Sequence, residues 1–207
     1  MMEWFSLVLS TIGLIFALID PPGYVPLFLS ITAGDSEEGR KRILRRALLA
    51  SFVILTVFTF LGNAILSFFS ISIPALQISG GLILLAIGFE MLNMLPRGEK
   101  LTRTEQSEAT TREDVSIIPL AIPMLAGPAS IVAVIVLAAR EASIRNYSAV
   151  IVSIAFTLGV TYLVLRFATP ILNKIGVTGL RVATRVMGLL LCAMAIQFVI
   201  DGYHAVR

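Results

Sequence analysis

Long uncharged apolar runs alternate with short charged segments along the whole chain. A helix that spans a bilayer needs about 20 apolar residues. The run 47–89 is long enough for two such helices, which we expect to join near Ser70–Pro74. The pattern therefore predicts six membrane spans, near residues 3–32, 46–69, 75–95, 115–139, 147–172 and 181–203.

The composition also indicates a membrane protein. Of the 207 residues, 57% are hydrophobic and 14% are charged, whereas a soluble domain has about 25% charged residues. The net charge of +3 is spread over short segments between the spans, which argues against a nucleic-acid partner. Cys192 and His204 are the only residues of their kinds, so disulfide frameworks, metal clusters and catalytic triads are hard to build. We expect no cofactor, no metal and no enzyme activity.

The distribution of Lys and Arg predicts the orientation in the membrane. Thirteen of the 16 fall in or beside the connections 1–2, 3–4 and 5–6 between spans. The positive-inside rule places these connections in the cytoplasm and both termini outside it, in a multi-pass protein of the cell membrane. No basic segment precedes the first apolar run, so we expect this span to be retained rather than cleaved as a secretory signal.

The most polar segment, residues 96–114, divides a single transmembrane domain into halves of three spans each, 1–95 and 115–207. We interpret this segment as a cytoplasmic linker. Homologous halves with an odd number of spans must cross the membrane in opposite senses, as in transporters with inverted repeats. When residues 81–90 are aligned with 188–197, four positions are identical. We therefore expect an all-α polytopic membrane protein, with six transmembrane helices arranged as two inverted three-helix repeats.

Each repeat begins with an interrupted helix, so helices 1 and 4 are expected to be broken. Pro-Pro-Gly follows Asp20 in the first span, and Gly127 and Pro128 interrupt the fourth. Proline lacks the N–H donor and clashes with the preceding turn, so we expect Pro21 or Pro22, and Pro128, to begin a second half-helix. A plain proline kink is the alternative. Free N–H groups at the start of the second half-helix favour binding of an anion. Free carbonyls at the end of the first half-helix favour binding of a cation. The expected substrate-binding residues are Asp20, Pro21, Pro22, Gly23, Tyr24, Gly127, Pro128, Ala129 and Ser130.

Asp20 is the most informative of these residues. A carboxylate at this depth costs at least about 2.5–3.5 kcal/mol on insertion scales. It can hold a substrate ammonium, a coupling cation or a proton, or it can cap the following half-helix. Glu90 is a second candidate for a coupling ion or proton, and snorkelling to the interface is its alternative role. Gln197 is its symmetry partner and is expected to make an interhelical hydrogen bond.

Two motifs match a known family. The pattern Asp-Pro-x-Gly-x-x-Pro covers Asp20–Pro26, and the pattern Pro-x-x-x-Gly-Pro covers Pro123–Pro128. The segment Met187–Gly202 also resembles the last helix of that family. With six spans and a polar linker after the third, the whole chain resembles the MarC family of prokaryotic integral membrane proteins. That family is described as small neutral amino-acid transporters and is similar to LysE-type exporters. Two positions depart from its usual pattern: Tyr24 stands where members often have Asn, and Ala129 where they often have Gly.

The resemblance implies secondary transport of a small neutral amino acid such as glycine or alanine. Na⁺ and H⁺ are the candidate coupling ions, membrane lipid is the other expected partner, and a homo-oligomer is left open. The residues by themselves favour only a small zwitterion or anion. The alternative is a passive channel for a small neutral solute, because aquaporin-like proteins also have six spans and inverted half-helices. The ionisable Asp20 and the position of the breaks inside full spans favour the carrier.

Overall fold

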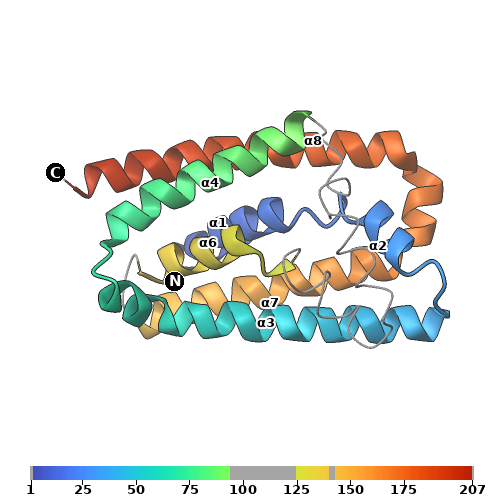
Figure 1. Ribbon diagram of the computed structural model, residues 1–207, viewed down its shortest axis with the longest axis horizontal. Helices are drawn as coiled ribbons and strands as arrows, with labels where there is room; N and C mark the ends of the chain where they lie inside the picture. The colour runs from blue at the N-terminus through green and yellow to red at the C-terminus, as the bar shows by residue number, and fades with distance from the viewer. Residues whose placement is uncertain (1, 94–124, 140–142, 207) are drawn as a thin grey trace.

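Only helices and the turns between them occur in the part of the chain that the computed structural model describes, residues 2–93, 125–139 and 143–206. Among them α3, α4, α7 and α8 are long and apolar enough to cross a membrane, and α1 and α6 are shorter apolar helices. The architecture is that of an all-α polytopic membrane protein, as expected. The expected linker 96–114 and the beginning of the expected fourth span lie outside the described residues. The helices are α1 (Met2–Ile19), α2 (Val25–Ile31), α3 (Glu37–Phe68), α4 (Ile73–Asn93), α6 (Pro128–Ala139), α7 (Ile144–Arg166) and α8 (Ala168–His204) (Figure 1).

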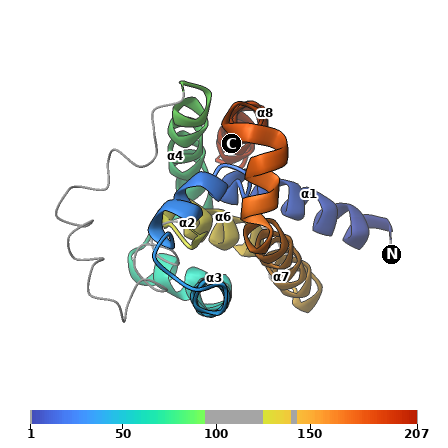
Figure 2. The ribbon, with the colours of Figure 1, turned by 90° about the vertical axis from the view of Figure 1, so that its right-hand side faces the viewer.

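The described helices form a bundle with a buried centre. Figure 1 shows α4 running antiparallel to α8 on one side and α3 running antiparallel to α7 on the other. The end-on view in Figure 2 places α6 and α2 between these pairs, with α1 reaching outward from the centre. Six consecutive side chains of α6, from Ala133 to Ala138, are buried. A helix that is apolar on all its faces is suited to this central position.

The outer helices expose large apolar side chains. On α3 these include Leu49 and Phe60, and on α8 they include Val182 and Leu189. Extensive apolar patches are rare on soluble monomers. Such surfaces are suited to contact with lipid acyl chains.

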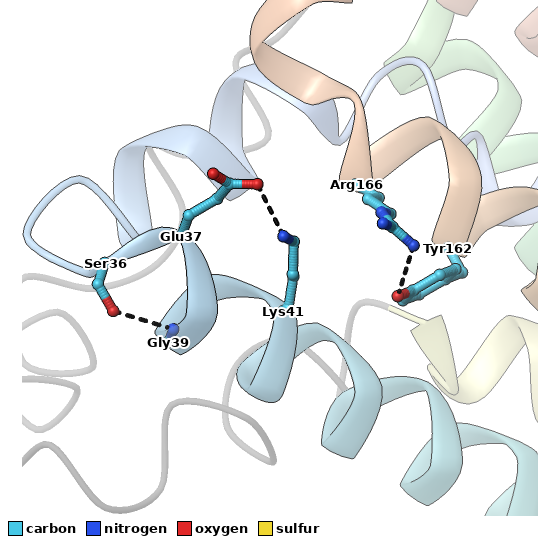
Figure 3. A network of polar contacts seen from close by, with 6 residues as sticks. All are labelled: Ser36, Glu37, Gly39, Lys41, Tyr162 and Arg166. Atoms are coloured by element: carbon cyan, nitrogen blue, oxygen red, sulfur yellow. Dashed lines mark hydrogen bonds and ion pairs between the residues drawn. The ribbon is translucent and has the colours of Figure 1, made fainter.

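Helix α3 begins nine residues earlier than the expected span 46–69, so that boundary was wrong. Ser36 caps the helix by accepting a hydrogen bond from the N–H of Gly39 at 3.1 Å (Figure 3). Glu37 lies in the first turn, where it complements the helix dipole, and it pairs with Lys41 at 2.8 Å. The basic segment that follows was expected to be a connection. It is helical because Lys and Arg are good helix formers and a capping serine precedes them.

The boundary expected between the fifth and sixth spans also needs correction. Helix α7 ends at Arg166 rather than near residue 172, and α8 begins almost at once, at Ala168. The chain changes direction at Gly176, whose φ of 72° lies in the left-handed region that glycine adopts without strain. Figure 1 shows α8 turning a corner before it runs back along α4. Residues 168–175 therefore form a short arm ahead of the long apolar part of α8.

Glycines allow α4 and α8 to pack closely. A Cβ atom on Gly81 would lie 2.8 Å from the carbonyl oxygen of Ala195 and 3.2 Å from the nitrogen of Val199. A Cβ atom on Gly188 would lie 3.1 Å from the carbonyl oxygen of Gly88. Both glycines thus stand where the backbone of one helix faces the backbone of the other, an arrangement common between membrane helices.

Candidate functional site

The first span is broken at the expected place. Helix α1 ends at Ile19, α2 begins at Val25, and the residues between them form turns. Tyr24 is the N-cap of α2, and its side chain makes no capping hydrogen bond. The expected position of the prolines was wrong in detail. Pro26 lies in the first turn of α2, whereas Pro21 and Pro22 lie in the break itself.

Asp20 lies at the centre of this break. Its relative exposure is 0%, and its φ of 46° is in the left-handed region. Asp and Asn enter that region more readily than other non-glycine residues. The N–H of Asp20 donates to the carbonyl of Phe16 at 2.9 Å, which closes the last turn of α1, and its own carbonyl accepts from the N–H of Gly23 at 3.0 Å. Two tight hydrogen bonds therefore fix the backbone on either side of the buried carboxylate.

Gly23 is required by the position of that carboxylate. A Cβ atom on Gly23 would overlap the Oδ2 atom of Asp20 and would lie 2.8 Å from the Oγ1 atom of Thr184. The carboxylate, the glycine and the threonine hydroxyl thus come together although Thr184 is on α8. No local signal in the sequence points to Thr184, because its place beside the break depends on how α8 packs against the other half of the chain.

The two prolines leave backbone carbonyls available at the end of α1. In a continuous helix the carbonyls of Ala17 and Leu18 would accept from residues 21 and 22. Pro21 and Pro22 have no N–H to donate. These carbonyls and the Asp20 side chain bring several hydrogen-bond acceptors to one buried point, a chemistry that suits an ammonium group or a cation.

The described part of the second break begins at Leu125. Pro128 is the first residue of α6, as expected, and the N–H of Ile131 donates to the carbonyl of Gly127 at 3.0 Å. Ala129 and Ser130 are buried in the first turn. Their N–H groups belong to the positive end of the α6 dipole, which favours an anion. In Figures 1 and 2 this end of α6 lies beside the C-terminal end of α1, and the two helices are in contact.

The structure does not bring Glu90 or Gln197 to the break. Glu90 is exposed on α4. Gln197 is exposed on α8 and donates from Nε2 to the Oδ1 atom of Asp201 at 2.6 Å, one turn along the same helix. This bond lies within one helix, whereas the expected bond of Gln197 was between helices. Spacing along a helix did not reveal which face each residue presents.

Buried hydroxyl groups line the contact between α1 and α7. The hydroxyl hydrogen of Ser153 is shared between the carbonyl of Ala149 on its own helix, at 2.7 Å, and the carbonyl of Val8 on α1, at 3.2 Å. The second contact joins the two helices directly. Thr11 lies about one turn beyond Val8, and Thr157 lies one turn beyond Ser153. Both threonines are buried, and neither Oγ1 atom has a hydrogen-bond partner among the described residues. This seam is a polar strip inside a part of the bundle that is otherwise apolar.

A cavity of about 590 Å³ borders α2, the start of α3 and the junction of α7 with α8. Its lining includes Phe28 of α2 and the cationic residues Arg40, Lys41 and Arg166. Arg40 donates from Nε to the carbonyl of Thr32 at 3.0 Å. Figure 3 shows Lys41 beside Glu37, and Arg166 pointing to the hydroxyl of Tyr162 at 3.5 Å. The cations of this cavity are therefore largely engaged by groups of the protein itself.

Comparison with known proteins accounts for nearly the whole chain. Residues 5–206 match the family model described as "MarC family integral membrane protein". The UPF0056 membrane protein MJ1677 of Methanocaldococcus jannaschii is 37% identical, over 97% of this chain and 96% of its own. YvbG of Bacillus subtilis is 36% identical over 96% and 94%, and YhcE of Escherichia coli is 35% identical over 94% and 90%. No solved structure matches the chain. This protein belongs to the MarC family of integral membrane proteins.

Proposed function

We propose that this MarC-family protein is a secondary transporter of small neutral amino acids such as glycine and alanine, driven by Na⁺ or H⁺. The observation that carries the proposal is the buried Asp20 carboxylate at the broken end of α1, beside the N-terminal end of α6. In this proposal the protein lies in the cell membrane with both termini outside the cytoplasm. Its six spans form two inverted repeats, 1–95 and 115–207, joined by a cytoplasmic linker.

The contacts between α4 and α8 support the inverted repeat. One shift along the sequence relates Gly81 to Gly188, Gly88 to Ala195 and Leu92 to Val199. A Cβ atom on Gly81 would meet the carbonyl oxygen of Ala195 and the nitrogen of Val199. A Cβ atom on Gly188 would meet the carbonyl oxygen of Gly88 and the nitrogen of Leu92. The two glycines therefore make equivalent contacts across the helix pair, as a two-fold relation between repeats requires.

Helices α3 and α7 add independent support. Ser51 and Thr59 are buried on α3, and each donates its hydroxyl hydrogen to the carbonyl four residues earlier. Ser153 and Thr161 are buried on α7 with the same spacing and the same bonds. Matching buried hydroxyls are consistent with a common origin of the two helices.

The chemistry of the two helix ends favours a zwitterion. The carboxylate of Asp20 and the carbonyls at the end of α1 suit an ammonium group or a coupling cation. The N–H groups of Ala129 and Ser130 at the start of α6 suit a carboxylate. Because the surrounding side chains leave little room around Gly23, a small substrate fits better than a large one.

Uptake into proteoliposomes tests the function. Purified protein should accumulate labelled glycine or alanine when a Na⁺ or H⁺ gradient is imposed, and the rate should saturate with substrate. Saturation is expected because a carrier rearranges once in each cycle. Flux that does not saturate and proceeds at channel rates would instead support the passive channel. The same assay is repeated with a panel of labelled amino acids. An absence of flux for every one of them would refute transport of this substrate class.

The variant Asp20→Asn tests the role assigned to the carboxylate. Asn keeps the size of the side chain and tolerates the positive φ of 46°, so the change removes the charge alone. Transport should fall at least tenfold with little change in thermal stability, since a hydrogen bond to a charged group contributes about 1.5–3 kcal/mol. Asp201→Asn, near the end of α8, is the matched control and should transport normally. Near-normal flux by Asp20→Asn would remove Asp20 from the mechanism.

A further inference from the structure

A basic groove lies on the outer side of α3, separate from the break in the first span. It has a volume of about 320 Å³, and its lining contains one acid and four cations. We call it the α3 groove, and its residues are Glu38, Lys41, Arg42, Arg45, Arg46 and Leu49. Lys41 is paired with Glu37, and Arg45 also contacts the hydroxyl of Tyr162 on α7. The side chains of Arg42, Arg45 and Arg46 are all exposed. The three arginines thus present concentrated positive charge to the surroundings.

An apolar strip continues from the groove along the same face of α3. Leu49 closes the groove and is 65% exposed, and Val53 and Phe60 follow at 57% and 53%. Residues three or four positions apart lie on one face of a helix. The surface therefore changes from cationic to apolar within about two turns, at the point where the uncharged part of α3 begins.

We propose that the α3 groove binds one anionic phospholipid. Its phosphodiester lies against Arg42, Arg45 and Arg46, and an acyl chain follows Leu49, Val53 and Phe60. Guanidinium groups suit phosphate oxygens because they donate two parallel hydrogen bonds. Clusters of Lys and Arg beside a membrane helix attract anionic headgroups. The apolar strip favours a lipid over a free phosphate ion, because a free ion would make no use of it.

Native mass spectrometry of the purified full-length protein in detergent tests this proposal. Titration with phosphatidylglycerol should add one lipid in preference to phosphatidylcholine, which has the same chains and no net charge. Inorganic phosphate should compete poorly, because it gains nothing from the apolar strip. Equal binding of the two lipids, or equally effective competition by phosphate, would overturn the proposal.

Two triple variants of the groove separate charge from folding. Replacing Arg42, Arg45 and Arg46 together by Gln keeps good helix formers on an exposed face. It should weaken phosphatidylglycerol binding about 100-fold, since each cation near an anionic surface contributes about a fivefold factor. Replacing the same three arginines by Lys keeps the charge and should change binding only a few-fold. Unchanged binding by the Gln variant would refute the proposal.

A matched control addresses general attraction between basic residues and anionic lipid. Lys174, Arg181 and Arg185 are three exposed cations on α8 that do not line the groove. Replacing them together by Gln removes the same charge from the same expected side of the membrane. Lipid binding should stay near the wild-type level. A loss as large as that caused by the groove variant would mean that net charge, and not the groove, holds the lipid.

Discussion

Replacing Gly81 or Gly188 by alanine is expected to push α4 and α8 apart. A Cβ atom would lie 2.8 Å from the carbonyl oxygen of Ala195 in the first case, and 3.1 Å from that of Gly88 in the second. Both oxygens belong to helix backbone, which cannot swing aside as a flexible side chain can. Restoring ordinary contact distances requires the helices to separate locally by about half an ångström, which a closely packed interior resists.

The free energy of unfolding should fall by a similar amount in both variants. Overpacking of a close contact typically costs about 1–3 kcal/mol. Alanine in a helix recovers about 0.5–1 kcal/mol relative to glycine. The expected net loss is therefore about 0.5–2 kcal/mol for each variant. The double variant should lose less than the sum, because one separation of the helices relieves both contacts.

Unfolding of purified protein in mixed micelles, followed by circular dichroism, measures these losses. Gly159→Ala on α7 is the control, because no atom lies within 4 Å of the Cβ position. It should leave stability unchanged or raise it by up to about 1 kcal/mol. If Gly81→Ala and Gly188→Ala are as stable as Gly159→Ala, the close approach of α4 and α8 is wrong, and with it this support for the repeat.

Two further expectations concern the break and the orientation. Gly23→Ala should remove most transport because its Cβ displaces the neighbouring carboxylate, whereas Gly13→Ala, with no atom within 4 Å, should transport normally in the same uptake assay. In a Cys192→Ala background, Ile144→Cys should react with an impermeant thiol reagent in intact cells, and Ser36→Cys only after permeabilisation. These residues lie at the starts of α7 and α3, at opposite ends of the bundle. The reverse labelling pattern would contradict the orientation.

The breaks could be predicted from the sequence because their causes are local. Proline lacks a backbone donor wherever it stands, so Pro21 and Pro22 prevent α1 from continuing, and Pro128 suits the first position of α6. The expected start of α3 was too late, because the basic residues ahead of the apolar run belong to the helix and not to a connection. A local signal was present in Ser36, which is a capping residue ahead of two acids. The charge pattern predicts the orientation of the chain in the membrane, but it did not predict this helix boundary.

Contacts between distant elements could not be predicted in the same way. Thr184 meets the break only because α8 packs beside it. Glu90 and Gln197 were paired by alignment, yet each lies on an exposed face of its own helix. Which side of a helix faces the core depends on its neighbours, and in a membrane chain both sides are apolar, so periodicity carries little information.

Asp20 combines three features that each oppose stability in a membrane helix: a buried carboxylate, a positive φ and two prolines that follow it. A helix that only had to cross the bilayer would have none of them. Here they act together. The prolines leave carbonyls available at the end of α1, the turn holds the carboxylate against Gly23, and burial keeps water from screening its charge. A cationic group that enters meets all of these at once, with the oppositely charged start of α6 beside it. The cations of the cavity near α3 are engaged by the protein's own groups, so the proposed recognition of a small zwitterion belongs to the helix ends and not to that cavity.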